Sequence, residues 1–94
     1  MEQNKLQIRY DTRYVGNRIS RAIGHVKLVK NMVESGTDCS DVLIQLAAVR
    51  GQLDSICSSI MTQYADQVAE EYRRSGDSEL LEQFKAELSR AIKK

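Results

Sequence analysis

Cys39, Cys57 and His25 are the side chains of this sequence that could ligate a soft metal or attack an electrophile. Cys39 directly follows Asp38, a residue type that often caps helices, so its thiol is expected in the first turn of a helix. The partial positive charge of a helix N-terminus favours the thiolate, whereas the carboxylates of Asp38 and Asp41 oppose it. We predict Cys39 as the effector-sensing residue, with a purely structural thiol as the equal alternative.

For His25 and Cys57 we predict a role in packing rather than a role in chemistry. His25 lies between Gly24 and Val26 and is predicted to be packed or interfacial rather than a ligand. Cys57 falls on an apolar row of the long helix described below, which predicts a small buried hydrophobe. Roughly 27 Å of helix would separate Cys57 from Cys39, so no disulfide is expected within one chain. Both thiols are typical of a reducing compartment.

The sequence carries no motif of an ordinary enzyme. It has one histidine and lacks a GxSxG elbow, a phosphate loop and an HExxH helix, so we expect no catalytic activity. No apolar run approaches the roughly 18 residues of a membrane span, and the first nine residues lack the apolar segment of a signal peptide. We therefore expect a cytoplasmic protein without a membrane partner.

The net charge of +1 conceals an uneven distribution of charge. Residues 1–34 carry seven basic and three acidic residues, whereas residues 35–94 carry seven basic and ten acidic residues. A basic N-terminal third on an otherwise acidic chain indicates a surface that faces a polyanion such as DNA. The alternative from charge alone is an ordinary solvated helix face.

The elements that must position these residues are helices. The sequence has no proline and few aromatic residues, so we predict an all-α, three-helix protomer in a single domain over residues 1–94, with residues 1–10 as a mobile arm. Asp11 or Thr12 caps a first helix, which Gly36 ends, and a short turn makes it antiparallel to the next. A third, shorter helix is expected after Asp77 or Ser78. Eight apolar positions form the predicted core stripe of the first helix: Val15, Ile19, Ala22, Ile23, Val26, Val29, Met32 and Val33.

The central helix, predicted from Asp38 to about Tyr72, organises the rest. Its apolar residues form two adjacent rows that repeat every three or four positions, so its apolar face is too wide for one partner helix. The helix would be roughly 50 Å long, more than the short flanks of the chain can cover. We therefore expect another copy of the chain to complete the core.

Three segments of the sequence resemble the CsoR/RcnR family of bacterial metal- or thiol-sensing repressors. They are RISRAIGHV at residues 18–26, with MVE at 32–34, and CSDVLIQLAAVR at residues 39–50; the resemblance extends over roughly residues 13–70. It implies three-helix protomers that pair antiparallel into a dimer of dimers. It also implies operator-DNA binding through basic residues of the first two helices, and release when an inducer acts.

At the effector site the sequence departs from that family. The resemblance matches Cys39 to the family's sensing cysteine, and it places Tyr64 and Val68 where copper sensors carry a histidine and a second cysteine. Neither tyrosine nor valine is a good ligand for Cu(I) or Ni(II), so Cys39 is at most one metal ligand. The persulfide and formaldehyde branches also lack their usual partners here, since Val68 replaces a cysteine and Glu2 replaces a proline.

Together these observations predict a homo-oligomeric DNA-binding repressor that an effector at Cys39 releases from its operator. The resemblance implies that the oligomer is a tetramer. The effector is a metal ion or a thiol-reactive sulfur or electrophile species. The candidate DNA-binding residues are Arg13, Arg18, Arg21 and Arg50. Two alternatives stay open: a constitutive DNA-binding paralogue with a vestigial sensor, and a helical assembly module that binds no nucleic acid.

Overall fold

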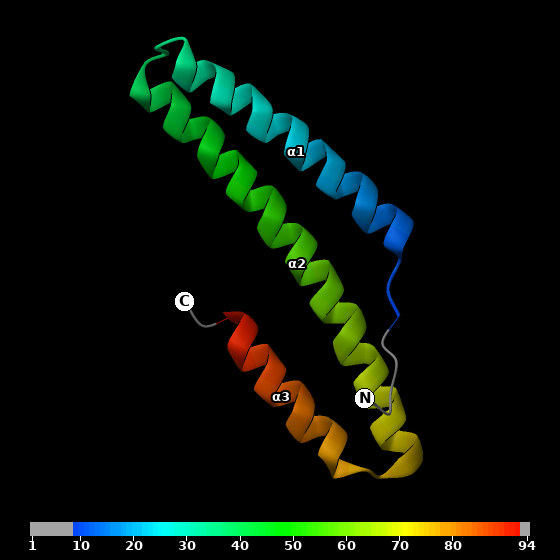
Figure 1. The fold of residues 1–94 in the computed structure, drawn as a ribbon. Coiled ribbons are helices and arrows are strands. Elements are labelled where there is room, and N and C mark those ends of the chain that lie inside the picture. The colour runs from blue at the N-terminus through cyan, green and yellow to red at the C-terminus, as the bar shows by residue number, and fades with distance from the viewer. Residues whose placement is uncertain (1–8, 93–94) are drawn as a thin grey trace, which may run out of the picture. The chain divides into compact units, whose positions relative to one another are not determined.

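The computed structural model describes residues 9–92, which form three helices and no strand, and this confirms the all-α prediction. The helices are α1 (Thr12–Glu34), α2 (Cys39–Ser75) and α3 (Ser78–Ile92) (Figure 1). Residues 1–8, which make up most of the predicted arm, lie outside the described residues, as do residues 93–94. The chain divides into two compact units, Asp11–Ser58 and a second unit whose described parts are residues 9–10 and 59–92. The single-domain assignment stays a prediction.

The helix ends follow the residues that the sequence singled out. The Asp11 carboxylate caps α1 by accepting a hydrogen bond from the Tyr14 backbone amide at 3.0 Å. Gly36 follows α1 with φ of +79°, in the left-handed region where glycine carries no steric penalty, and this ends the helix as predicted. Asp38 then caps α2, since its Oδ2 accepts from the Ser40 backbone amide at 3.1 Å.

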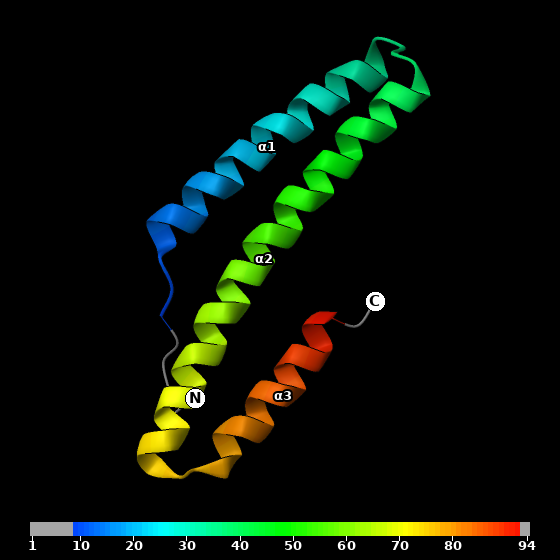
Figure 2. The ribbon, with the colours of Figure 1, turned by 180° about the vertical axis from the view of Figure 1, so that it is seen from behind.

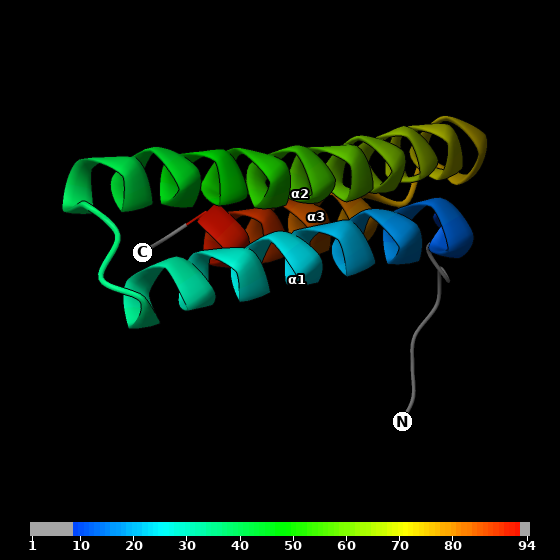
Figure 3. The ribbon, with the colours of Figure 1, turned by 90° about the horizontal axis from the view of Figure 1, so that it is seen from above.

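In the unit Asp11–Ser58, α1 and the first part of α2 form the predicted antiparallel hairpin (Figures 2 and 3). The buried residues of this hairpin recur every seven positions: Val15, Ala22 and Val29 on α1, and Val49 and Ile56 on α2. This seven-residue repeat is the seam of a two-helix coiled coil.

The predicted core stripe of α1 is only partly correct within one protomer. Ile19, Ile23, Val26 and Val33 are between 41% and 58% exposed, whereas Val15, Ala22 and Val29 are buried. The buried residues face α2, and the exposed ones project from the flank of the seam. The hairpin therefore leaves a row of large apolar residues in contact with solvent.

In the second unit, α3 packs on the C-terminal part of α2 (Figure 1). Val68 on α2 and Leu80 on α3 are buried, and the rings of Tyr64 and Phe84 meet edge to face with centroids 4.8 Å apart. The backbone amide of Arg9 donates to Gln67 Oε1 at 2.8 Å, which holds Arg9 against the part of α2 in this unit.

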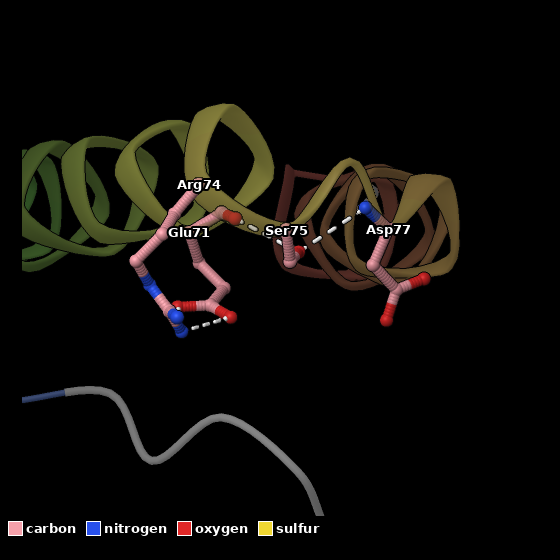
Figure 4. Close-up of polar contacts among 4 residues, drawn as sticks. All are labelled: Glu71, Arg74, Ser75 and Asp77. Carbon is pink, nitrogen blue, oxygen red and sulfur yellow. Dashed lines mark hydrogen bonds and ion pairs between the residues drawn. The ribbon is translucent and has the colours of Figure 1, made fainter.

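Polar contacts organise the turn between α2 and α3 (Figure 4). Arg74 pairs with both carboxylate oxygens of Glu71, and Ser75 Oγ donates to the Glu71 carbonyl at 2.9 Å. Ser75 Oγ also accepts from the Asp77 backbone amide, while Asp77 caps α3 by accepting from the Glu79 amide. No helix within residues 9–92 is long and apolar enough to cross a membrane.

Candidate nucleic-acid interface and effector cysteine

Arg18 is the predicted DNA-binding residue that the structure holds most firmly. Its guanidinium donates to Ser55 Oγ on α2 at 2.7 Å and to the Tyr14 hydroxyl at 3.2 Å. It also lies 5.4 Å from the centroid of the Tyr14 ring, within the range of a cation–π contact. Three contacts with two residues therefore order a long side chain that would otherwise lose conformational entropy on binding a ligand.

Arg18 and Arg21 line one small hollow between α1 and α2. Gln52 and Ile56 from α2 complete its walls, and its volume is about 140 Å³. Two guanidinium groups beside one amide suit an oxyanion, because arginine matches the geometry of phosphate oxygens with two donors at once. The structure thus brings two of the four candidate arginines together.

The other two candidate arginines lie elsewhere on the hairpin. Arg13 is exposed in the first turn of α1. Arg50 lines a separate hollow of about 340 Å³ whose other walls are Leu43, Leu46 and Ala47. One protomer therefore does not gather all four guanidinium groups at one place.

His25 occupies a polar layer inside the α1–α2 seam. Its Nε2 lies 2.8 Å from Gln45 Oε1, and its Nδ1 lies 2.7 Å from Gln52 Nε2. Each ring nitrogen therefore faces the side-chain amide of a glutamine on α2, so both nitrogens have a hydrogen-bond partner. The prediction of a packed histidine is confirmed. Its two glutamine partners were missed, although their seven-residue spacing on α2 places them on one helix face.

Cys39 begins α2 and its side chain is exposed, so a reagent in solution can reach it. Its neighbour Asp38 has its carboxyl pKa lowered by hydrogen bonds from the Ser40 hydroxyl and backbone amide, so this carboxylate stays charged beside the thiol. The side chain of Cys57 is exposed rather than buried, which corrects the prediction of a buried hydrophobe. It lies on the flank of α2, away from the buried positions Val49 and Ile56.

Tyr64 and Val68 contribute to packing between α2 and α3. The Tyr64 hydroxyl donates to Glu87 Oε1, and Val68 is 3% exposed. Burial, followed by the hydrogen bond and the charge of Glu87, raises the pKa of Tyr64 to about 12. A phenol that keeps its proton and an apolar side chain do not supply the donors that a soft metal requires.

The residues of one protomer therefore do not fit a copper-type metal site. Among residues 9–92 no group of three or more His, Cys, Asp or Glu side chains is arranged to hold a metal ion. Cys39 and Tyr64 belong to different compact units of the chain. Of the residues predicted at the effector site, the structure leaves only Cys39 with an available donor atom.

A wide apolar surface lies on the same hairpin. Leu43 and Ile44 are each 63% exposed, and Leu46 and Leu53 are 45% and 49% exposed. Ile19, Ile23, Val26 and Val33 of α1 are exposed as well, so both helices of the hairpin present large apolar side chains to solvent. We call the α2 part of this surface, Leu43, Leu46 and Leu53, the apolar face of α2.

One helical hairpin therefore carries the held Arg18 side chain beside Arg21, together with the exposed thiol of Cys39. Residues 11–94 match the family model described as metal-sensitive transcriptional repressor. The chain belongs to this family, the CsoR/RcnR family, whose members are transcriptional repressors and not enzymes.

Among curated proteins, the copper-sensing transcriptional repressor CsoR of Bacillus subtilis (strain 168) is similar to the chain. The two are 33% identical over 76 residues, which cover 76% of this chain and 75% of the relative. No solved structure matches the chain significantly.

Proposed function

We propose that this chain is a homo-oligomeric repressor that binds operator DNA and leaves it when an effector acts at Cys39. The observation that carries the proposal is the ordered Arg18 side chain, which Tyr14 and Ser55 hold beside Arg21 at the α1–α2 hollow. An arginine with a fixed orientation contacts a phosphate at a smaller entropic cost than a free one. Family membership supplies the regulatory context.

The DNA contacts are proposed to come from Arg13, Arg18, Arg21 and Arg50. They act mainly on backbone phosphates, with the operator distinguished in part by its shape. No recognition helix is required for this mode of binding. Because each neutralised phosphate releases counterions, affinity should fall steeply as salt rises.

The oligomer is proposed to form through the apolar face of α2. Leu53 and Leu46 are about half exposed in the protomer, and burying such side chains against a second copy stabilises an assembly by roughly 1.5 to 3 kcal/mol for each residue fully buried. Arg50 lies at the edge of this face, beside Leu43 and Leu46. A dimer of dimers would therefore carry several copies of the arginine pair to one DNA site.

The effector is proposed to be a thiol-directed electrophile or sulfur species that modifies Cys39. The exposed thiol at the start of α2 supports this, whereas Tyr64 and Val68 argue against a copper-type ligand set. A metal ion that uses Cys39 with donors from outside the protomer is the other effector class. Release requires a coupling free energy on the order of 1 to 3 kcal/mol between the thiol and the DNA-bound arrangement.

A constitutive DNA-binding paralogue is the second candidate function. The engagement of Tyr64 with Glu87 and the burial of Val68 favour it, because both positions are committed to packing α3. Such a protein would bind DNA like a repressor but would respond to no effector.

The test is a gel shift of the full chain with the DNA upstream of its own gene, at about 50 mM and about 200 mM salt. Binding that weakens strongly at the higher salt supports the repressor, and no binding at the lower salt overturns it in favour of a helical assembly module. Adding Cu(I), Ni(II), persulfide or an aldehyde to the complex, with mass spectrometry of Cys39, then separates an inducible repressor from a constitutive one.

A further inference from the structure

Arg18 differs from the other candidate DNA-binding arginines in how its side chain is held. Arg18 is half-buried, whereas Arg13, Arg21 and Arg50 are exposed. Its guanidinium donates from Nη1 to the Tyr14 hydroxyl and from Nη2 to Ser55 Oγ. Because a guanidinium can only donate, both hydroxyl oxygens are acceptors in these bonds. One hydroxyl from α1 and one from α2 therefore hold the two terminal nitrogens of the same side chain.

The partners of Arg18 leave its positive charge uncompensated. Within residues 9–92 its hydrogen bonds go to neutral hydroxyls, whereas Arg74, for comparison, pairs with both carboxylate oxygens of Glu71. The hollow beside Arg18 adds the positive charge of Arg21, and none of its described lining residues is acidic. An arginine that is ordered without a counter-ion is arranged for an anion from outside the protomer.

The contacts of Arg18 also leave some of its donors available to a ligand. Each hydrogen bond uses one N–H group of a terminal nitrogen, so a second N–H remains on each of these nitrogens, together with the Nε–H. The ring of Tyr14 adds a cation–π contact at 5.4 Å, which uses no N–H group. Pairs of such N–H groups match the oxygens of a phosphate. Arg18 is therefore restrained and still able to bind.

We propose that Ser55 and Tyr14 are positioning residues of the DNA interface, which restrain Arg18 so that its remaining N–H groups meet a backbone phosphate beside Arg21. This inference rests on the proposed function. An unrestrained arginine gives up rotamer freedom when it binds, which weakens binding by about twofold to tenfold. Here the fold orders the side chain before DNA arrives. Ser55 is neutral and lies on α2, so the charge of the N-terminal third gives no indication of this role.

The experiment measures the affinity of the full chain for a labelled duplex, taken from the DNA upstream of its gene, by fluorescence anisotropy over a series of salt concentrations. Ser55→Ala and Tyr14→Phe each remove one hydroxyl, and Tyr14→Phe keeps the ring. Ser55→Thr is the conservative variant, because it keeps a hydroxyl at the same position. Ser58→Ala is the matched control, since it removes a serine hydroxyl from an exposed position one turn further along α2. Circular dichroism establishes that each variant is folded.

Ser55→Ala and Tyr14→Phe should each bind about twofold to tenfold more weakly than wild type. The slope of log affinity against log salt should stay that of wild type, because neither hydroxyl is charged and the same number of phosphates is neutralised. Ser55→Thr and Ser58→Ala should bind like wild type. Wild-type affinity in either hydroxyl-free variant would overturn the role of that residue and leave the repressor proposal intact, because DNA is still bound.

The same substitution in an Arg18→Ala background separates positioning from other roles. If Ser55 acts through Arg18, Ser55→Ala should cause no further loss of affinity when the guanidinium is absent. A full further loss in that background would overturn the inference, since Ser55 would then act on DNA or on the fold directly. Wild type that binds no duplex at low salt would overturn the proposed function and this inference together. If Ser55→Ala fails to fold, Tyr14→Phe decides the question by the same criteria.

Discussion

The hydroxyl of Tyr64 on α2 donates a hydrogen bond to the carboxylate of Glu87 on α3. The same tyrosine meets the ring of Phe84 edge to face, at 79° between the ring planes. One side chain therefore makes both a polar and an aromatic contact with α3. The resemblance assigns the position of Tyr64 to a metal ligand, whereas in this chain its side chain links α2 to α3.

Tyr64→Phe should keep the aromatic contact and remove the hydrogen bond. We expect a loss of about 1 kcal/mol in the free energy of unfolding, the usual net contribution of one such bond. Chemical denaturation near neutral pH measures the loss. Tyr72→Phe is the matched control, because Tyr72 lies on the same helix and its side chain is exposed. Equal stability of the two variants would contradict the role assigned to the bond.

The stability of wild type should also depend on alkaline pH through Tyr64. Its pKa is raised from 10.0 to about 12 in the folded chain, so the folded state keeps a proton that the unfolded state loses. This contribution is fully present below about pH 10 and is lost as pH rises toward about 12. Wild type should therefore lose more stability than Tyr64→Phe over this interval. Parallel losses would show that Tyr64 does not carry the effect.

Much of the helical framework could be predicted from single residues with defined backbone roles. Asp11, Gly36, Asp38 and Asp77 mark helix ends by capping or by a left-handed backbone, and these are local properties that the sequence expresses directly. The antiparallel hairpin then follows from the short turn.

The interior of the hairpin could not be predicted in the same way. Helical periodicity identifies apolar rows, but it does not say whether a row faces another part of the chain or a second copy. Ala22 is buried in the seam within the hairpin, whereas its neighbour Ile23 remains exposed. The partners of His25 were missed for a related reason. A glutamine is usually a surface residue, and only the position of α1 shows that Gln45 and Gln52 face the histidine.

Cys39→Ala should abolish induction and leave DNA binding intact. The thiol is exposed at the start of α2, whereas Arg18 and Arg21 line a hollow with residues of the middle of that helix. Gel shifts with and without the candidate effectors measure both properties. Cys57→Ala is the matched control, since it removes the other exposed thiol and should still respond. A normal response from Cys39→Ala would refute the sensing role.

Arg18→Ala should weaken DNA binding and reduce its dependence on salt. Loss of one phosphate contact lowers the slope of log affinity against log salt by about one. Arg73→Ala is the control, because Arg73 pairs with Glu70 near the end of α2 and is mostly exposed. Anisotropy titrations over a series of salt concentrations give both slopes. An unchanged slope for Arg18→Ala would remove this residue from the DNA contacts.

Leu53→Glu should break the oligomer without unfolding the hairpin. Leu53 is 49% exposed in the protomer, so a carboxylate there remains hydrated in the isolated chain, but it would be buried and unpaired against a second copy. Ser58→Glu is the matched control, because it places the same charge on an exposed position of α2 that is turned about 140° from Leu53 around the helix.

Sedimentation at micromolar concentration distinguishes the outcomes. Wild type and Ser58→Glu should sediment as the assembled oligomer, whereas Leu53→Glu should sediment as a smaller species with helical circular dichroism. Because several copies bring their arginine pairs to one DNA site, Leu53→Glu should also bind DNA more weakly than either. A Leu53→Glu protein that sediments like wild type would show that the apolar face of α2 is not the interface. If wild type sediments as a folded monomer, the proposal that the chain forms an oligomer is wrong.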